Sequence, residues 1–129
     1  MDNFRNRDAA RQLIDFDGLT FDDIQPTDID GMIEYRNQAY VIFEFKYDAA
    51  EMPLGQRLCI ERMTDALAKA GKKAVAFLCS HQSRIGEDIL ARNAIVKRIY
   101  YKGEWYYGRG KTALEETTNF LNFIKEKKK

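Results

Sequence analysis

The sequence contains 129 residues, of which 45% are hydrophobic and 32% charged, and its formal net charge is +1. This length and composition are typical of one soluble globular domain, so we expect a single domain covering residues 1–129. No apolar run approaches the roughly 18–20 residues that a membrane helix needs, and the charged N-terminus lacks the apolar core and the cleavage site of a secretory signal. We therefore expect a cytoplasmic protein with no membrane segment.

Charge is distributed unevenly along the chain. Residues 1–65 carry a net charge of −7, and residues 66–129 carry a net charge of +8. An acidic half suits a cation site, and a basic half suits contacts with the phosphates of a nucleic acid. The alternative explanation is that oppositely charged faces simply pack together within one domain.

The first half of the chain predicts a helix followed by a β-hairpin. Residues 3–14 place apolar side chains at intervals of four or five, which is typical of an amphipathic helix. Residues 15–25 show no clear period, and either a short strand or an irregular crossing segment fits them. Two β-rich runs, 28–35 and 39–46, follow, and the three residues between them predict a hairpin turn.

The second half predicts a helix, a central strand, a second hairpin and a final helix. Apolar residues recur at three- and four-residue steps over 53–70, with Pro53 at the start and Gly71 just past the end. Residues 73–81 form a continuous apolar run, as expected of a strand covered on both faces. The remaining predicted elements are strands at 94–101 and 104–107 and a helix at 112–125. Together these elements predict an α/β domain with a central mixed sheet flanked by helices.

The two cysteines fit this architecture as core residues. Cys59 lies in the predicted helix and Cys79 in the central strand. Neither has the spacing to other cysteines or to histidine that marks a zinc cluster or a disulfide framework. We therefore expect two buried, reduced thiols.

The turn of the first hairpin decides which side chains share a face, because a one-residue slip in register moves every side chain to the other face. A two-residue turn would place Asp30 opposite Phe43 and mix charged with apolar groups on both faces. A three-residue turn, with Asn37 or Gln38 in the left-handed conformation, places Asp30 opposite Glu44. We predict the three-residue turn, because it separates charged from apolar side chains.

In this register one face of the hairpin is charged. Asp28, Asp30 and Glu44 share it with Lys46, while the opposite face is apolar. Directly opposed like charges destabilise a strand pair by ~0.2–1 kcal/mol, so the carboxylates need a partner. A divalent cation supplies one. The side chains predicted on the apolar face are Ile29, Ile33, Val41, Phe43 and Phe45.

Mg²⁺ fits the charged face, and Mn²⁺ is expected to substitute for it. Mg²⁺ prefers hard oxygen ligands and is commonly held by one or two carboxylates plus a substrate phosphate, so Asp30 and Glu44, with Asp28, are the predicted ligands. A bound ion lowers the pKa of water and neutralises charge on a phosphate. Lys46 is predicted to orient the attacking water or help deprotonate it. The alternative is a surface salt-bridge patch in which Lys46 balances Asp28.

The segment Pro26-Thr-Asp-Ile-Asp30-Gly, with thirteen residues between Asp30 and Glu44-Phe-Lys46, resembles the PD-(D/E)xK nuclease superfamily. The resemblance covers roughly residues 3–81 and implies a restriction-endonuclease-like core of helix, antiparallel hairpin, helix and strand. It implies that Asp30 is the metal-binding aspartate, with Asp28 as its competitor, that Glu44 is the second ligand and that Lys46 is the motif lysine. The implied activity is Mg²⁺-dependent hydrolysis of phosphodiester bonds in DNA.

Gln56 adds a second, partly independent signal. Its position on the apolar face of the predicted helix turns its amide inward near the strand ends, where it needs hydrogen-bond partners. It resembles the glutamine that RecB-like and phage exonuclease-like members carry near the site, although Ile60 and Glu61 stand where the RecB-like pattern has a tyrosine. A simple helix-start glutamine is the alternative. Some members also carry an acidic ligand on the first helix, for which Asp8 is the candidate here.

Basic residues of the second half are candidates for a phosphate-binding rim. The predicted substrate-binding residues are Lys72, Lys73, Arg84 and Arg98, and Lys69, Arg92 and Lys97 are further members of this rim. The aromatic residues Tyr100, Tyr101, Trp105, Tyr106 and Tyr107 are interleaved with basic ones and could stack on unpaired bases. Because side chains alternate along a strand, we expect half of these rings in the core and keep the outer half as binding candidates.

The leading hypothesis is therefore a Mg²⁺-dependent DNA nuclease. The alternatives are a catalytically inactive, nuclease-like module that binds DNA or protein, and a nuclease that acts on RNA or branched DNA. The retained Asp30, Glu44 and Lys46 favour an enzyme. Compact members of the superfamily occur in phage and often dimerise to cut both strands, so the resemblance also admits a homodimer. Endonuclease and exonuclease modes both stay open.

Overall fold

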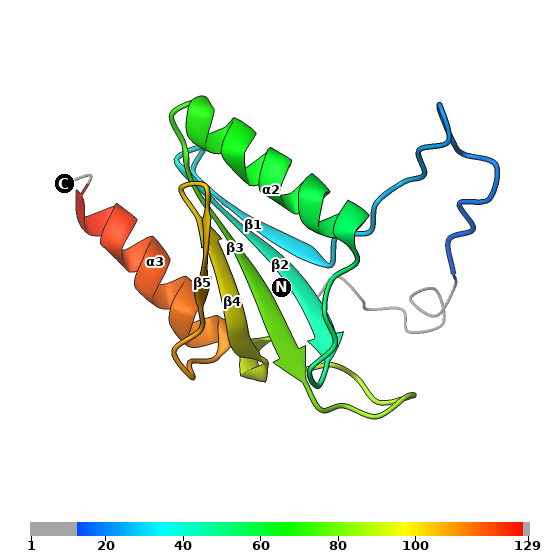
Figure 1. The fold of residues 1–129 in the computed structure, drawn as a ribbon. Coiled ribbons are helices and arrows are strands. Elements are labelled where there is room, and N and C mark those ends of the chain that lie inside the picture. The colour runs from blue at the N-terminus through cyan, green and yellow to red at the C-terminus, as the bar shows by residue number, and fades with distance from the viewer. Residues whose placement is uncertain (1–12, 128–129) are drawn as a thin grey trace.

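The computed structural model describes residues 13–127, which form an α/β domain built on one mixed sheet (Figure 1). The sheet has five strands in the order β1-β2-β3-β4-β5. β2 and β3 are parallel, and the other neighbours are antiparallel. The strands are β1 (Gly31–Tyr35), β2 (Ala39–Tyr47), β3 (Lys73–His81), β4 (Ile95–Tyr101) and β5 (Glu104–Tyr107), and the helices are α2 (Leu54–Lys69), α3 (Ala113–Lys127) and the short 3₁₀ helix η1 (Ala91–Asn93).

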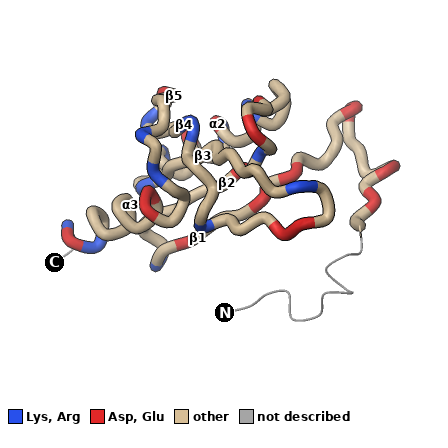
Figure 2. The backbone as a smooth tube through the Cα atoms, turned by 90° about the horizontal axis from the view of Figure 1, so that it is seen from below, with Lys and Arg blue, Asp and Glu red and all other residues tan. Residues whose placement is uncertain are grey.

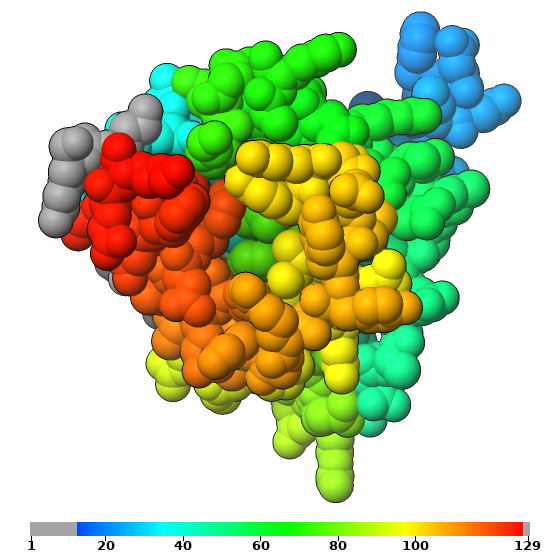
Figure 3. All heavy atoms as spheres, turned by 60° about the vertical axis from the view of Figure 1, so that its left-hand side comes forward, coloured from blue at the N-terminus to red at the C-terminus, as the bar shows by residue number. Residues whose placement is uncertain are grey.

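The two long helices cover opposite faces of the sheet (Figure 1). α2 packs on one face, and α3 lies on the other, beside the β4–β5 hairpin on the molecular surface (Figure 3). The predicted arrangement, a mixed sheet flanked by helices, is confirmed at this level. The apolar residues on the α3 side are Val41, Phe43, Val75, Phe77, Cys79, Ala94, Val96 and Ala113, and those on the α2 side are Ile42, Ile60, Ala76 and Tyr100.

The N-terminal predictions fall largely beyond the described part of the chain. Of the helix predicted over 3–14, residues 3–12 lie outside the described residues, as does Asp8, and Leu13 and Ile14 are exposed with no regular structure. Residues 15–25 form an irregular segment, one of the two structures expected, in which Phe21 and Ile24 pair across a tight turn.

The register of the first hairpin is the predicted one. Gly31 lies opposite Phe43, and Ile33 lies opposite Val41, which corresponds to a three-residue turn. The ladder ends at Gly31. As a result Ile29 no longer follows the alternation and packs on the α2 side, so the prediction that it joins the apolar face with Ile33 is wrong.

The hairpin turn has two residues in the left-handed conformation. Asn37 adopts it as predicted, with φ of 56°, but the second is Arg36, with φ of 50°, and not Gln38. The amide of Gln38 instead donates a hydrogen bond to the Tyr35 carbonyl oxygen at 2.8 Å. That bond closes the turn and leaves Gln38 in an ordinary conformation.

Both ends of α2 and the start of α3 have identifiable causes. Pro53 precedes α2, and Gly71, with φ of +88°, follows it where a left-handed residue is needed. α3 begins with a capping box, in which the Thr112 hydroxyl accepts the Glu115 amide at 3.1 Å and the Glu115 carboxylate accepts the Thr112 amide at 2.9 Å. These three helix ends therefore follow from local sequence.

The cysteines are free, as expected. Cys79 is buried on the α3 side of β3, and burial raises its pKa to about 12, so it remains a thiol at neutral pH. Cys59 is only half-buried on α2.

Candidate active site

Four polar side chains meet on the α2 side of the sheet. Glu44 and Lys46 lie in the second half of β2, Asp30 comes directly before β1, and Gln56 lies in the first turn of α2. Glu44 and Lys46 share a face because they are two residues apart on one strand. Extending the observed register by one residue sets Asp30 opposite Glu44.

Glu44 is the centre of this group. The residue is only 3% exposed, and its Oε1 lies 3.9 Å from the Nζ of Lys46. Asp30 and Gln56 are its other polar neighbours. The second carboxylate oxygen, Oε2, is buried without a hydrogen-bond partner. A buried acidic oxygen without a partner is costly and rare in folded proteins.

The environment raises the pKa of Glu44 to about 8. Burial is the largest cause, followed by a hydrogen bond with the Asp30 carboxyl group and by the charge of Asp30. Lys46 and Gln56 act in the opposite direction and lower the pKa. Without a cation Glu44 is therefore largely protonated at neutral pH.

Asp30 and Asp28 have different positions. The Asp30 carboxylate accepts a hydrogen bond from the Phe45 amide at 2.8 Å, which ties the segment before β1 to β2. Asp28 is exposed, and its backbone carbonyl accepts a hydrogen bond from Gln56 Nε2 at 3.0 Å. Within residues 13–127 no three or more His, Cys, Asp or Glu side chains gather closely enough to hold a metal ion.

Three carboxylates were predicted to cluster, but only Asp30 and Glu44 lie together, and Asp28 does not join them. Asp28 was expected opposite Lys46, but the ladder stops at Gly31 and the alternation that would have turned the Asp28 carboxylate inward is lost. What Asp28 contributes is its backbone carbonyl, which holds the Gln56 side chain. The inward position predicted for Gln56 is observed.

The oxygen atoms of this group suit a hard divalent cation. Glu44 Oε2 and Gln56 Oε1 are both buried acceptors without hydrogen-bond partners. Asp30 supplies a further carboxylate, and Lys46 offsets part of the negative charge. Mg²⁺ takes such oxygen ligands and keeps part of its water shell, so a site with two carboxylates is sufficient for it.

The structure separates the predicted basic residues into two groups. Lys73 lies opposite Ala39, and Lys72 donates a hydrogen bond from Nζ to the Asn37 carbonyl at 2.8 Å. Both are at the far end of β2 from Glu44, roughly 16 Å away for five residues of strand. Lys72 and Lys73 therefore do not lie beside Asp30 and Glu44, which we call the acidic group.

Arg84 and Arg98 lie nearer. Arg84 is in the loop that follows β3. This loop starts at the same edge of the sheet as Lys46, because the ends of β2 and β3 are paired in parallel. Arg98 lies two strands across from Glu44. Figure 2 shows basic residues beside β4 and β5 and acidic residues along the segment that leads into β1.

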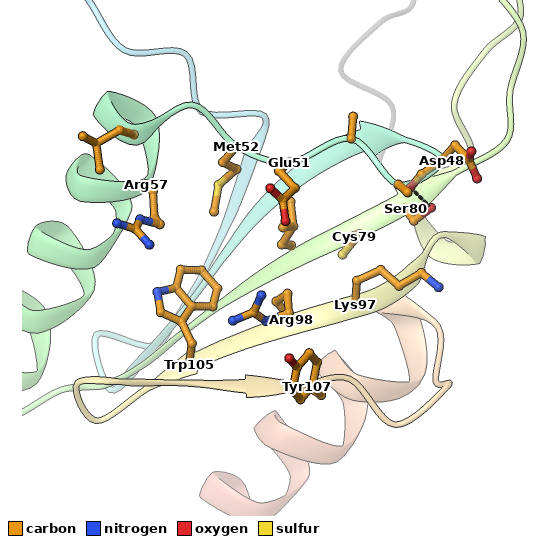
Figure 4. Close-up of a pocket in the computed structure, with 14 residues that line it drawn as sticks. Asp48, Glu51, Met52, Arg57, Cys79, Ser80, Lys97, Arg98, Trp105 and Tyr107 are labelled. Carbon is orange, nitrogen blue, oxygen red and sulfur yellow. Dashed lines mark hydrogen bonds between the residues drawn. The ribbon is translucent and has the colours of Figure 1, made fainter.

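A row of side chains crosses the sheet from the acidic group. Glu44 pairs with Leu78, Leu78 with Arg98, and Arg98 with Tyr107 at the sheet edge. A cavity of about 550 Å³ opens along the Leu78, Arg98 and Tyr107 part of this row, beside the segment between β2 and α2, and Glu44 is not one of its lining residues (Figure 4). This segment shows no periodic pattern of apolar residues, so its role in forming the cavity was not predicted.

The aromatic residues of the second hairpin divide by face, as alternation requires. Tyr101 packs against Phe120 on the α3 side, with ring centroids 6.0 Å apart. Tyr100 and Trp105 pack together on the α2 side, 5.1 Å apart. Tyr107 is 81% exposed and borders the cavity. Tyr107 is therefore an exposed ring on the same face as Glu44.

Comparison of the chain with protein-family models, with curated proteins and with solved structures finds no match. No helix within residues 13–127 is long and apolar enough to cross a membrane. The evidence for a function therefore comes from the chemistry of the site.

The raised pKa of Glu44 predicts how the stability of the metal-free protein changes with pH. Between the ordinary pKa of 4.5 and the folded value of about 8, the folded protein holds a proton that the unfolded chain has lost. The stabilisation is complete below the lower value and is lost as pH rises through the higher one, by at most about 1.4 kcal/mol per pH unit.

Denaturant unfolding in EDTA, at roughly pH 5, 7 and 9, measures this effect. The free energy of unfolding of wild type should fall with pH relative to that of Glu44→Gln, which has no proton to lose at this position. Parallel curves for the two proteins would show that Glu44 ionises normally.

Proposed function

We propose that this chain is a Mg²⁺-dependent nuclease of the PD-(D/E)xK type that hydrolyses phosphodiester bonds in DNA. The observation that carries the proposal is the buried Glu44, which faces Asp30, Lys46 and Gln56 and has an oxygen without a partner. A strongly shifted pKa produced by burial and a like charge is more frequent at functional sites than elsewhere. The Asp, Glu-x-Lys and Gln residues of the motif all contribute to this environment.

The residues have distinct roles in the proposed reaction. Asp30 and Glu44 hold the ion, with Gln56 Oε1 as a further oxygen ligand. The ion neutralises charge on the scissile phosphate and makes water more acidic. Lys46 orients the attacking water through Nζ and stabilises the negative charge that develops on the phosphate.

The order of the elements supports the proposal. The order β1-β2-α2-β3, in which an antiparallel hairpin is followed by a helix and a further strand, is the order that the resemblance implies for a restriction-endonuclease-like core. Glu44 lies on β2 and Asp30 directly before β1, and Gln56 of α2 is beside Glu44. The residues predicted to form the first helix of that core, 3–14, lie mostly outside the described part of the chain.

Positive charge near the site supports DNA as the substrate. Lys97 and Arg98 lie on β4, on the far side of Leu78 from Glu44. Cationic side chains at this position can hold the phosphates that flank the scissile one. DNA affinity is therefore expected to fall steeply with salt.

A gel assay tests the function directly. Linear, circular, single-stranded and branched DNA, and an RNA of the same sequence, are incubated with the protein in Mg²⁺, in Mn²⁺ or in EDTA. The proposal expects cleavage of DNA with either ion and none in EDTA. Glu126→Gln, a change of an exposed carboxylate on α3, is the matched control and should cleave like wild type.

The other outcomes identify the alternatives. Cleavage of RNA alone would reassign the substrate. DNA binding without cleavage under any condition would identify a nuclease-like binding module and contradict the proposed activity.

A further inference from the structure

The cavity beside the acidic group has one wall built from β4 and β5. Arg98 and Lys97 extend from β4, and Trp105 and Tyr107 extend from β5 (Figure 4). The opposite wall consists of the segment that leads from β2 into α2, including Met52. At about 550 Å³ the cavity falls within the roughly 300–1,000 Å³ of small-ligand sites.

Arg98 is held by the two aromatic rings. Its guanidinium carbon lies 4.9 Å from the centre of the Tyr107 ring and 5.7 Å from that of Trp105. Its Nε is buried and has no hydrogen-bond partner. A guanidinium in this position is fixed by cation–π contacts and still has an unused donor.

The backbone holds Tyr107 at this edge. Directly after it, the amide of Gly108 donates a hydrogen bond to the Lys97 carbonyl at 2.7 Å. A Cβ at Gly108 would lie 1.8 Å from the Val96 carbonyl oxygen, so only glycine allows this approach. The exposed ring of Tyr107 is therefore displayed from a fixed point of the sheet.

The β4 wall of the cavity is cationic and favours an anionic ligand. Lys97 and Arg98 contribute two cations there, whereas Arg57 is paired with Glu61 at 3.9 Å. Asp48 and Glu51 contribute two carboxylates on the opposite side. Asp48 already accepts a hydrogen bond from Gln82 Nε2 at 3.0 Å. A flat aromatic group suits the exposed ring, and an anion suits the unused donor, so the ligand that combines both is a nucleotide.

We propose that this cavity binds an unpaired nucleotide of single-stranded DNA, with its base stacked on Tyr107 and its phosphate on Arg98. The inference rests on the proposed nuclease function and names the form of its substrate. Arg98 and Tyr107 lie about two and three strand spacings from Glu44, roughly 10 and 14 Å, so a short extended strand reaches from the cavity to the acidic group. Bases paired inside a duplex cannot enter, and the site therefore selects single-stranded ends or flaps.

The only tryptophan of the sequence, Trp105, is a built-in probe of this cavity. Its fluorescence is followed in EDTA while a short oligo(dT) is added to the full chain, so that no cleavage interferes. An abasic strand of equal length carries the same phosphates without bases, and a blunt duplex carries paired bases. The proposal expects oligo(dT) to change the Trp105 fluorescence. It also expects oligo(dT) to bind at least about tenfold more tightly than the abasic strand or the duplex.

Two neighbouring tyrosines give a matched pair of variants. Tyr107→Ala should weaken oligo(dT) binding by roughly tenfold, the scale of one lost base stack. Tyr106→Ala, on the opposite face of β5 and also exposed, should not change it. Arg98→Gln should weaken binding as well and should reduce its salt dependence. Thermal melting of each variant checks that it is folded.

The outcomes separate this inference from the proposed function. Equal binding of oligo(dT), the abasic strand and the duplex, or unchanged binding by folded Tyr107→Ala and Arg98→Gln, would overturn the nucleotide site even if the protein cleaves DNA. Selective, Tyr107-dependent binding by a protein that cleaves nothing in Mg²⁺ would support the nucleotide site and reject the nuclease.

Discussion

Glu44→Gln is expected to abolish Mg²⁺-dependent cleavage of DNA while leaving the fold intact. The amide has the size of the carboxylate but lacks the charge that holds the cation. The loss should be at least on the order of 10²–10³-fold, the scale on which single electrostatic groups contribute to catalysis. Initial rates with saturating Mg²⁺, measured beside Glu126→Gln, give this number.

Stability distinguishes a catalytic Glu44 from a structural one. The wild-type carboxyl group is buried, faces Asp30 and has its pKa raised to about 8, so the fold disfavours its ionised form. The neutral amide escapes this cost, and metal-free Glu44→Gln should be as stable as wild type at pH 5 and more stable above pH 8. An unfolded variant would assign Glu44 to the architecture, and a folded variant that still cleaves would place the active site elsewhere.

Lys46→Ala is the second change with a large expected effect. It removes the cation that lies 3.9 Å from Glu44 and lowers the pKa of that residue. Cleavage should fall by a similar order of magnitude, because both the water-orienting group and a positive charge near the phosphate are lost. Initial rates measured as for Glu44→Gln provide the test.

The stability of Lys46→Ala should change in the opposite direction to that of Glu44→Gln. Without Lys46 the two carboxyl groups are less well balanced, so the metal-free protein should be less stable above pH 8. It should also gain more from added Mg²⁺ by binding linkage, provided that the ion still binds. Lys73→Ala, at the far end of β3, is the control and should cleave within a few-fold of wild type. Equal losses from both lysine variants would point to a general charge effect.

The sequence was most informative where side-chain alternation applied. The register of β1 and β2 could be predicted because only one turn length separates charged from apolar residues, and that register sets Glu44 and Lys46 on one face with Asp30 opposite. The same rule failed for Asp28 and Ile29. They precede the ladder, where a hydrogen bond from the Phe45 amide to the Asp30 carboxylate directs the chain instead of strand pairing.

Features that depend on long-range arrangement were harder to predict. Lys72 and Lys73 were expected near the acidic group, but parallel pairing places the start of β3 beside the start of β2, away from Glu44. This position of Lys72 and Lys73 follows as soon as β2 and β3 are taken as a parallel pair. The cavity could not be predicted in this way, because the segment between β2 and α2 is irregular and the cavity forms where this segment meets β3, β4 and β5.

Titration of the metal-free protein with Mn²⁺ in a calorimeter at pH 7 tests the central claim most directly. Wild type should bind one ion per chain and release protons, because Glu44 must lose its proton to become a ligand. Asp30→Asn and Glu44→Gln should each weaken the affinity by at least about tenfold, and Glu126→Gln should not. Identical titrations for all four proteins, or no binding by wild type, would contradict the assignment of Asp30 and Glu44 as a metal centre.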